Sequence, residues 1–321
     1  MKNKFTEQAG VEVPLICGAM YPCSNPELVA AASESGALGI VQPLSLTYVH
    51  GYDFRKGLQY IRTLTKKPIG LNVLVEKSSA KYAEKNMQWV DIALDEGVRF
   101  FITALGNPKW VVDKVHARGG VVYHDVVNKK WAEIALSHGI DGLICVNNRA
   151  GGHAGTLSPE ELLKDLKPLG KPLICAGGVG DPEMFKKMLA MGFDGVQMGT
   201  RFIATTECTA NDEYKQAILK ATADDVILTD KLTGVPVSVI NTDYVKSSGA
   251  KAGPLAQWLL SHPKLKHYMR LFYMVQSTIK LKRSLKKVRS KKDYWQAGKS
   301  VDGIESILPV KEIVKTFSAG I

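Results

Sequence analysis

Short runs of apolar and β-branched residues recur along the first two thirds of the chain, and each run is followed by a segment with the residue spacing of a helix. The runs cover residues 15–17, 38–41, 69–73, 98–103, 121–124, 142–146, 172–176 and 195–198. Eight strand–helix repeats of about 26 residues favour a closed parallel (β/α)8 barrel, the TIM barrel of the α/β class. An open doubly wound sheet is the alternative.

The alternation of strands and helices stops after residue 198. Residues 210–296 are mainly helical in character, and residues 310–317 have the spacing of one last amphipathic helix. We therefore expect residues 1–205 and 305–321 to form the barrel. Residues 206–304 are expected to form an added helical subdomain that covers the barrel mouth.

Composition places the chain among ordinary globular proteins. Hydrophobic residues make up 45% of the chain and charged residues 23%, no stretch of 18 or more apolar residues occurs, and residues 1–10 lack the apolar core of a signal peptide. The sequence thus predicts a soluble, cytoplasmic protein with no membrane span. The five cysteines form no Cys-x-x-Cys pair, so neither a metal site nor a dithiol redox motif is expected.

The formal net charge of +11 is unevenly distributed. Residues 280–292 contain eight lysines and arginines and no acidic residue, and Leu281, Leu285 and Val288 recur among them at helical spacing. This basic segment is typical of a helix that docks by a narrow apolar stripe and exposes its charges to solvent. Attraction to an anionic surface is the alternative; nucleic acid is not expected as a partner.

One histidine stands among glycines directly after the sixth predicted strand. Residues 146–157 read Val-Asn-Asn-Arg-Ala-Gly-Gly-His-Ala-Gly-Thr-Leu. Gly151 and Gly152 lack the Cβ atom that would block the backbone from approaching a ligand, and His153 titrates near neutral pH. His153 is therefore the candidate catalytic residue.

The next two strands also end in glycine-containing loops. In a TIM barrel a phosphate is commonly held by the loops after strands seven and eight, where backbone N–H groups point at the anion. Two tight turns without a ligand are the alternative. None of the glycine patterns matches a dinucleotide fingerprint or a Walker loop, so a mononucleotide such as FMN fits better. The candidate cofactor contacts here are Ala176, Gly177, Gly178, Gln197, Met198, Gly199 and Thr200.

Two further strand ends could contact a flavin ring. Asn72, near the end of the third strand, carries an amide that both donates and accepts hydrogen bonds. The backbone of Ala19 and Met20, after the first strand, could lie along the ring. A purely structural cap is the alternative interpretation of Asn72.

Five segments together resemble the nitronate monooxygenases, formerly called 2-nitropropane dioxygenases. The segments are residues 14–20, 70–73, 149–155, 176–179 and 197–202. Relatives of that family include flavin-dependent enoyl-ACP reductases and NAD(P)H:quinone reductases. The resemblance implies an FMN-dependent oxidoreductase with a small-molecule substrate; it leaves open a role for NAD(P)H and a homodimeric assembly.

The resemblance also implies a role for His153 over the flavin. There it would act as general base toward a neutral nitroalkane or as a polar anchor for the nitronate anion. The substrate reduces the flavin and oxygen reoxidises it, giving a carbonyl compound and nitrite. Many family members carry a glutamine where this chain has Val146 and a glutamate where it has Arg149. Arg149 is therefore a candidate substrate contact, and the choice of substrate stays open. His124 is a second candidate, because it ends the fifth strand and is expected to face the barrel mouth.

Three other functions are weighed against this one. Inosine monophosphate dehydrogenase chemistry needs a nucleophilic cysteine after strand six, and residues 147–158 contain none. An enoyl-ACP reductase would use NAD(P)H and an acidic carrier protein that the basic segment could attract. A non-enzymatic polyanion-binding protein would be colourless, whereas an FMN protein is yellow.

Overall fold

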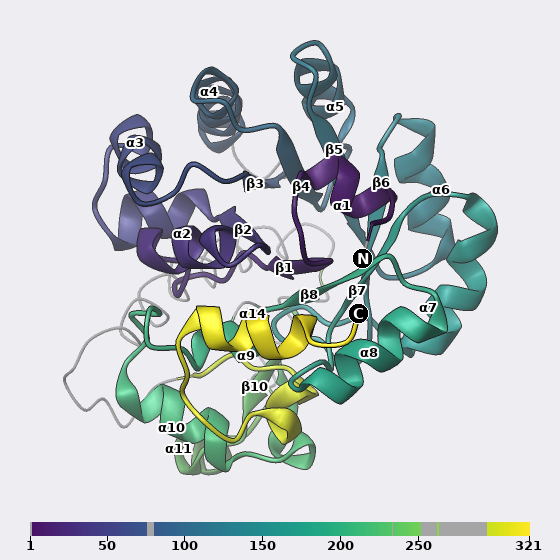
Figure 1. Cartoon of the computed structure of the whole chain (residues 1–321). Coiled ribbons are helices and arrows are strands. Elements are labelled where there is room, and N and C mark those ends of the chain that lie inside the picture. The colour runs from purple at the N-terminus through teal and green to yellow at the C-terminus, as the bar shows by residue number, and fades with distance from the viewer. Residues whose placement is uncertain (1, 76–79, 233, 252–261, 263–293) are drawn as a thin grey trace.

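The computed structural model describes residues 2–75, 80–232, 234–251, 262 and 294–321. In it eight parallel strands close into a barrel in chain order (Figure 1). The strands are β1 (Leu15–Cys17), β2 (Leu38–Val41), β3 (Ile69–Leu74), β4 (Phe100–Ala104), β5 (Val121–Val126), β6 (Gly142–Val146), β7 (Leu173–Ala176) and β8 (Gly195–Met198). The predicted TIM barrel is thereby confirmed.

Helices between the strands form the outer wall (Figure 1). The wall helices are α2 (Pro26–Glu34), α3 (Phe54–Leu64), α4 (Ala80–Asp95), α5 (Lys109–His116), α6 (Lys129–Ser137), α7 (Pro159–Leu166) and α8 (Pro182–Met191), with a π-helical turn η1 (Ser45–Val49) and a 3-10 turn η2 (Lys167–Leu169). Asp181 caps α8, because its carboxylate accepts a hydrogen bond from the backbone N–H of Met184.

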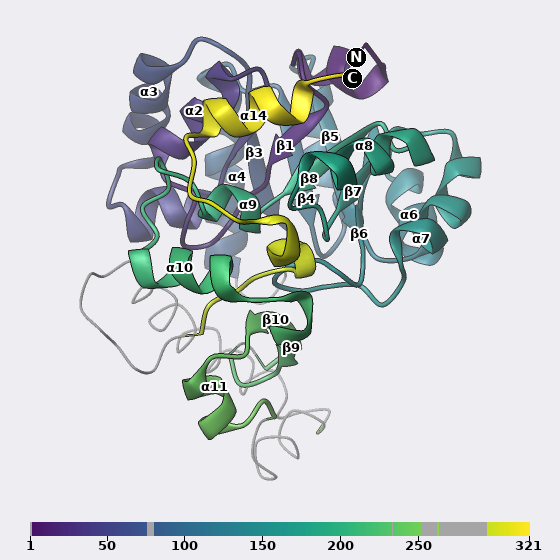
Figure 2. The same cartoon turned by 60° about the horizontal axis from the view of Figure 1, so that its bottom comes forward.

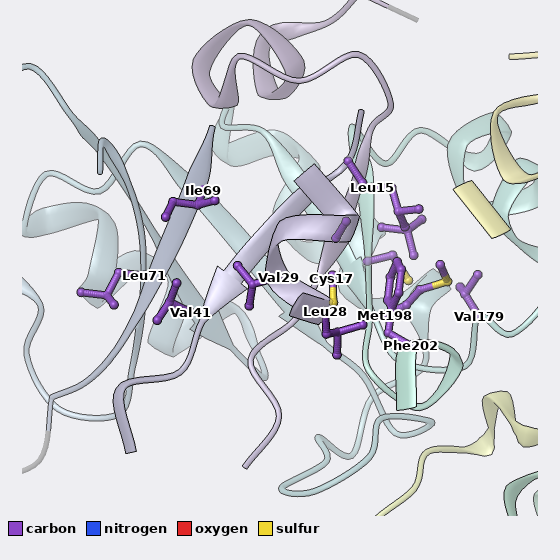
Figure 3. Close-up of a cluster of buried hydrophobic side chains, with 14 of the residues drawn as sticks. Leu15, Cys17, Leu28, Val29, Val41, Ile69, Leu71, Val179, Met198 and Phe202 are labelled. Atoms are coloured by element: carbon purple, nitrogen blue, oxygen red, sulfur yellow. The ribbon is translucent and has the colours of Figure 1, made fainter. Parts of the chain in front are cut away.

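Between sheet and helices lies a continuous apolar layer (Figure 3). Leu15 and Cys17 from β1, Leu28 and Val29 from α2, and Met198 from β8 are all buried in it. Each strand therefore buries one set of alternate residues against the helices, and its other set faces the barrel interior.

The barrel interior is filled from below by a short N-terminal helix, α1 (Lys4–Ala9). Its Phe5 is fully buried, and the Phe5 ring lies 6.0 Å from the rings of both Phe100 and Tyr123. Ile16, Ile144 and other inward-facing side chains belong to the same apolar cluster. The end of the barrel at which the strands begin is thus closed by packed side chains, so a ligand is expected at the opposite end, where the active sites of TIM barrels lie.

The chain after β8 contains helices and a two-stranded antiparallel sheet. These elements are α9 (Thr200–Ile203), α10 (Asp212–Lys220), η3 (Ala223–Asp225), β9 (Val226–Thr229), β10 (Val237–Ile240), α11 (Asp243–Ser248) and η4 (Lys299–Gly303). Figure 2 shows α10, α11 and the β9–β10 sheet beyond the end of the barrel that lies away from α1. The basic segment 280–292 lies outside the described residues.

The last helix, α14 (Val310–Ser318), returns to the barrel wall and packs against α2 and α8 (Figures 1 and 2). The Phe317 ring meets the Phe185 ring at 5.5 Å in an edge contact. The last amphipathic helix predicted from the sequence is thus present. Across the described residues, no helix combines the length and the apolar character that a membrane crossing requires.

Candidate active site

Asn147, the first residue after β6, ties the loop after β6 to the loop after β7. Its buried side chain donates to the carbonyl of Gly177 at 3.0 Å and accepts from the backbone N–H of Arg149 at 2.8 Å. Its backbone N–H donates to the carbonyl of Ala176 at 3.1 Å. Both loops are therefore held in one fixed arrangement at the barrel mouth.

Gly177 and Gly178 adopt backbone conformations that favour glycine, with φ of 116° and 81°. A Cβ atom on Gly178 would lie 2.6 Å from Nε of Arg149 and 2.8 Å from its Cδ. The Arg149 side chain thus lies directly on the glycine loop after β7. Arg149 makes no ion pair with any described residue, so its charge is available to an anion at this loop.

A C-terminal strap, residues 294–303, crosses the same loops. The N–H of Gly298 donates to Oγ1 of Thr200 at 2.9 Å, and a Cβ atom on Gly151 would lie 2.9 Å from the Gly298 nitrogen. The Trp295 ring stacks on the Tyr214 ring of α10 at 5.7 Å. The strap therefore connects the loops after β6 and β8 to the added segment.

The backbone N–H groups of Gly178 and Gly199 donate to no described protein atom. The Thr200 hydroxyl accepts from Gly298 and keeps its own proton to donate. Together with Arg149 in the loop after β6, which contacts Gly178, these groups are donors carried by the neighbouring loops after β7 and β8. Such a cluster suits a phosphate or another oxyanion.

One layer of inward-facing residues forms the floor of the mouth. The strand registers place Gly18, Asn72, Asp125 and Ala176 in this layer, contributed by β1 and its extension, β3, β5 and β7. Gly18 therefore lies across from Asp125, and Asn72 lies across from Ala176. Gln197 belongs to the layer beneath.

Polar atoms of this floor and of the layer beneath it lack partners among the described residues. The Asn72 side chain is nearly buried and makes no hydrogen bond to any described residue. Oε1 of Gln197 and Oδ1 of Asp125 are buried without a partner in the described part of the chain. Buried polar groups are normally satisfied by protein, water or ligand, so these atoms are available to hydrogen-bond a polar molecule at the mouth.

His153 stands in the loop after β6, next to Gly152. Gly152 is held by an isolated bridge to Ser238 of β10, whose N–H donates to the Gly152 carbonyl at 2.7 Å. The His153 side chain is exposed. Partial desolvation by the surrounding protein lowers the pKa of His153 below its ordinary value of 6.5, so the ring is neutral at pH 7.

His124 is oriented differently from the other candidate residues. It alternates with Tyr123 and Asp125, which face the barrel interior, and therefore faces the helical layer. Its Nδ1 lies 2.8 Å from Oγ1 of Thr103. The Thr103 hydroxyl also lies 3.1 Å from the Tyr123 carbonyl, so Thr103 bridges the His124 ring and the backbone of β5. Burial lowers the pKa of His124 to about 4.

The remaining candidates line the mouth in different ways. Met20 lies against Gly199, where a Cβ atom would meet the Met20 sulfur at 3.4 Å, and Ala19 packs on the inner apolar cluster. Met198 points into the layer between sheet and helices, beside Val179 and Phe202 (Figure 3). Only the backbone of Met198 is thus available to a ligand.

Sequence reasoning missed two residues of the site, Asp125 and Asn147. A single signal could have found Asp125: an acidic residue directly after an apolar run, where the strand can continue. Asn147 was part of the glycine-rich segment, but its cross-link to the loop after β7 depends on the closed barrel. The inward direction of Asp125 and the cross-link made by Asn147 become known only with the strand registers.

A (β/α)8 barrel that carries hydrogen-bond donors and a histidine at the C-terminal ends of its strands is typical of enzymes, whose active sites lie at that end of the barrel. The chain belongs to the nitronate monooxygenase family, because the family model described as "Nitronate monooxygenase" matches residues 2–320. The chain is accordingly an oxidoreductase.

Individual relatives differ in the reactions that their names describe. The chain is 32% identical, over 77% of its length and 68% of the relative's, to (3aS,4S,5R,7aS)-5-hydroxy-7a-methyl-1-oxo-octahydro-1H-indene-4-carboxyl-CoA dehydrogenase of Rhodococcus jostii (strain RHA1). It is 25% identical to a probable nitronate monooxygenase of Staphylococcus saprophyticus, over 76% of this chain and 80% of that protein. The solved structure of FabK from Thermotoga maritima aligns with a TM-score of 0.80 and 26% identity, over 99% of this chain and 95% of that one.

Proposed function

We propose that this protein is an FMN-dependent nitronate monooxygenase, which oxidises alkyl nitronates with oxygen to a carbonyl compound and nitrite. The observation that carries the proposal is the cluster of free donors at the loops after β7 and β8, next to a floor of unpartnered polar atoms. The phosphate of a flavin mononucleotide would accept from the free donors, and the polar edge of its ring would bind the unpartnered polar atoms of the floor.

The residues present fit FMN. The N–H groups of Gly178 and Gly199, the Thr200 hydroxyl and the Arg149 guanidinium would hold the phosphate. The amide groups of Asn72 and Gln197, left without a complete set of partners, would bind the polar edge of the ring. Gly18, Ala19, Met20, Gly151 and Gly152 would lie along the ring.

Bound FMN would supply the electron transfer to and from substrate. His153 would remove the proton from the carbon next to the nitro group of a neutral nitroalkane, because its lowered pKa keeps the ring nitrogen free at pH 7. Toward a preformed nitronate, His153 would hold the anion by a hydrogen bond. The segment 206–304 would cover the mouth and limit access of water.

A second substrate class is favoured by one comparison. The 32% identical relative is named for a reaction on a carboxyl-CoA thioester. A thioester has an acidic carbon next to a carbonyl group, so the same histidine would take the same kind of proton. Arg149 would serve equally well near a phosphate of CoA or of NAD(P)H.

Cofactor release tests the proposal. We expect the purified protein to be yellow and to release FMN on heating, as identified by chromatography against FMN and FAD standards. Recovery of FAD, or of no flavin from a fully reconstituted sample, would defeat it. Oxygen consumption with propane-2-nitronate, compared with NADH and NADPH oxidation in the presence of a quinone or an enoyl thioester, then separates the substrate classes.

A further inference from the structure

Asp125 is an ionisable group of the barrel mouth that the proposed function does not yet use. It lies in the same inward-facing layer as Asn72, across from Gly18. Its side chain is partly exposed, and its inward position directs that exposed surface to the mouth. Its Oδ1 atom is buried and accepts no hydrogen bond within the described part of the chain.

The position of Asp125 relative to the proposed flavin contacts indicates what it touches. The proposed phosphate contacts come from the loops after β7 and β8, and the proposed ring contacts come mainly from the β1 loop and from β3. Asp125 is on β5, the neighbour of the strand whose loop carries His153. The β5–β6 side of the mouth is therefore the side left for the substrate.

The surroundings of Asp125 favour its protonated form. No described cation pairs with it, and its buried oxygen has no donor to stabilise a negative charge. Burial raises the pKa of Asp125 to about 7. A neutral carboxyl group can donate a hydrogen bond, whereas a carboxylate can only accept one.

We propose that Asp125 is a further catalytic residue of this site, which donates a hydrogen bond to the substrate oxygen that carries negative charge. That oxygen belongs to the nitronate group or, in the second substrate class, to the carbonyl of a thioester. A protonated carboxyl placed in an apolar site serves this role in enzymes that stabilise an oxyanion. The inference rests on the proposed function, because it needs a flavin to define the substrate side.

Among the described residues, few other ionisable groups come from the elements next to Asp125. Its layer partners Gly18, Asn72 and Ala176 do not titrate. Cys145 of β6 stays a neutral thiol because burial raises its pKa well above the ordinary value. Tyr123 precedes Asp125 by two residues on the same face of β5, and its hydroxyl donates to the Gln8 side chain at 2.7 Å. The loop above contributes His153 and Arg149, so His153 is the group whose titration must be separated from that of Asp125.

Binding of an inert oxyanion to the FMN holoenzyme tests the proposal. Nitrate is planar like a nitronate but cannot be oxidised by flavin, and its dissociation constant follows from the change in flavin absorbance. We expect the wild-type constant to rise about tenfold between pH 6 and pH 8, because the protonated fraction of Asp125 falls and the carboxylate repels the anion. Asp125→Asn keeps a donor without a charge, and should bind nitrate with little dependence on pH.

Three variants complete the design. Asp125→Ala should bind nitrate several-fold more weakly than wild type at pH 6, His153→Asn should keep the tenfold pH dependence, and the exposed-site control Asp113→Asn should match wild type. An Asp125→Asn holoenzyme with the wild-type pH dependence, or a wild-type protein whose affinity for nitrate is undetectable or constant with pH, overturns the inference. A wild-type protein that binds no FMN refutes the proposed function instead. The wild-type pH profile needs no variant, so poor folding of a variant leaves the test intact.

Discussion

His153 is the residue at which proton transfer and cofactor binding can be separated. It lies in the loop after β6, outside the proposed phosphate contacts, so His153→Ala should retain FMN. Its loss should lower kcat/KM for neutral nitroethane by about 100-fold or more, the usual scale for a positioned general base. Activity on the preformed nitronate should fall less, because that proton is already gone. Steady-state rates on both substrates measure the difference.

The pH profile gives an independent check on the same residue. Because desolvation lowers the pKa of His153, kcat/KM for nitroethane should fall only as the pH drops below 6.5. His116→Ala is the control, since His116 is exposed and pairs with Asp141 at 2.9 Å. Equal losses on nitroethane and its nitronate would mean that His153 binds substrate without abstracting a proton.

Arg149 stands at a position where the family resemblance leads us to expect a glutamate, so its charge is opposite to the expected one. Its contact with Gly178 places the guanidinium at the proposed phosphate loop. Arg149→Gln should therefore weaken FMN binding about tenfold or more, since a charge-assisted hydrogen bond contributes roughly 1.5–3 kcal/mol. Titration of the apoprotein with FMN, monitored by flavin fluorescence, measures this. The loss should shrink at high salt.

The alternative role of Arg149 gives a different result. If the guanidinium serves the substrate, FMN affinity is unchanged and KM rises for an anionic substrate while KM for a neutral quinone stays the same. Arg118→Gln is the control, because Arg118 is exposed and pairs with Asp95 at 3.0 Å. Unchanged FMN affinity would refute the phosphate assignment.

For single residues, the sequence indicated which residue types stand at the ends of the strands better than it indicated which side chains point into the barrel. His124 and Asp125 are adjacent, yet only Asp125 faces inward. The apolar run before them is buried on both faces, so its composition carries no alternation that would tell the inner side from the outer. The register against β4 and β6 decides this, and that register is a property of the closed sheet.

The glycine loop after β7 is the element that best tests the proposed phosphate site. Gly178→Ala would place a methyl group 2.6 Å from Nε of Arg149 at a φ of 81°, a backbone conformation strained for alanine. The backbone or Arg149 must then move, and FMN affinity should fall about tenfold or more, since a displaced donor loses its charge-assisted contact. Apoprotein titration measures the change.

A second glycine offers a matched control for that substitution. Gly170 ends the η2 turn with a φ of 69°, and a Cβ atom there meets nothing within 4 Å. Gly170→Ala therefore shares the conformational cost of Gly178→Ala without its clash and lies far from the proposed phosphate loop. FMN affinities reduced equally in the two variants would trace the effect to general destabilisation.

Elements with a strong pattern were predicted well, and weakly patterned ones were missed. The eight barrel strands are short apolar runs separated by capped helices, so their order followed from the sequence. The β9–β10 sheet consists of two strands of four residues each. Ser238 of β10 also donates a backbone hydrogen bond to Gly152, which is far away in the sequence. Such a sheet depends on contacts that local periodicity does not encode.

The two ends of the barrel differ in their side chains: one end is packed with apolar residues, and the other carries glycine loops and polar atoms. The start of the barrel is closed by α1 and a cluster of aromatic rings. The opposite end carries the glycine loops, the unpartnered polar floor and the strap. Changes at the closed end should therefore alter stability without altering affinity for FMN.

Phe5→Ala tests this division. Phe5 is fully buried against the rings of Phe100 and Tyr123, so its truncation removes apolar contacts and leaves a cavity, which costs about 3–5 kcal/mol of unfolding free energy. The midpoint of urea unfolding should fall accordingly, while FMN affinity of the folded variant stays at the wild-type value. Leu64→Ala, at a site where the side chain is 40% exposed on α3, should change the midpoint far less. If Phe5→Ala keeps the wild-type unfolding midpoint, the contacts of α1 do not stabilise the core. If the variant is folded but binds FMN weakly, the two ends of the barrel are energetically coupled.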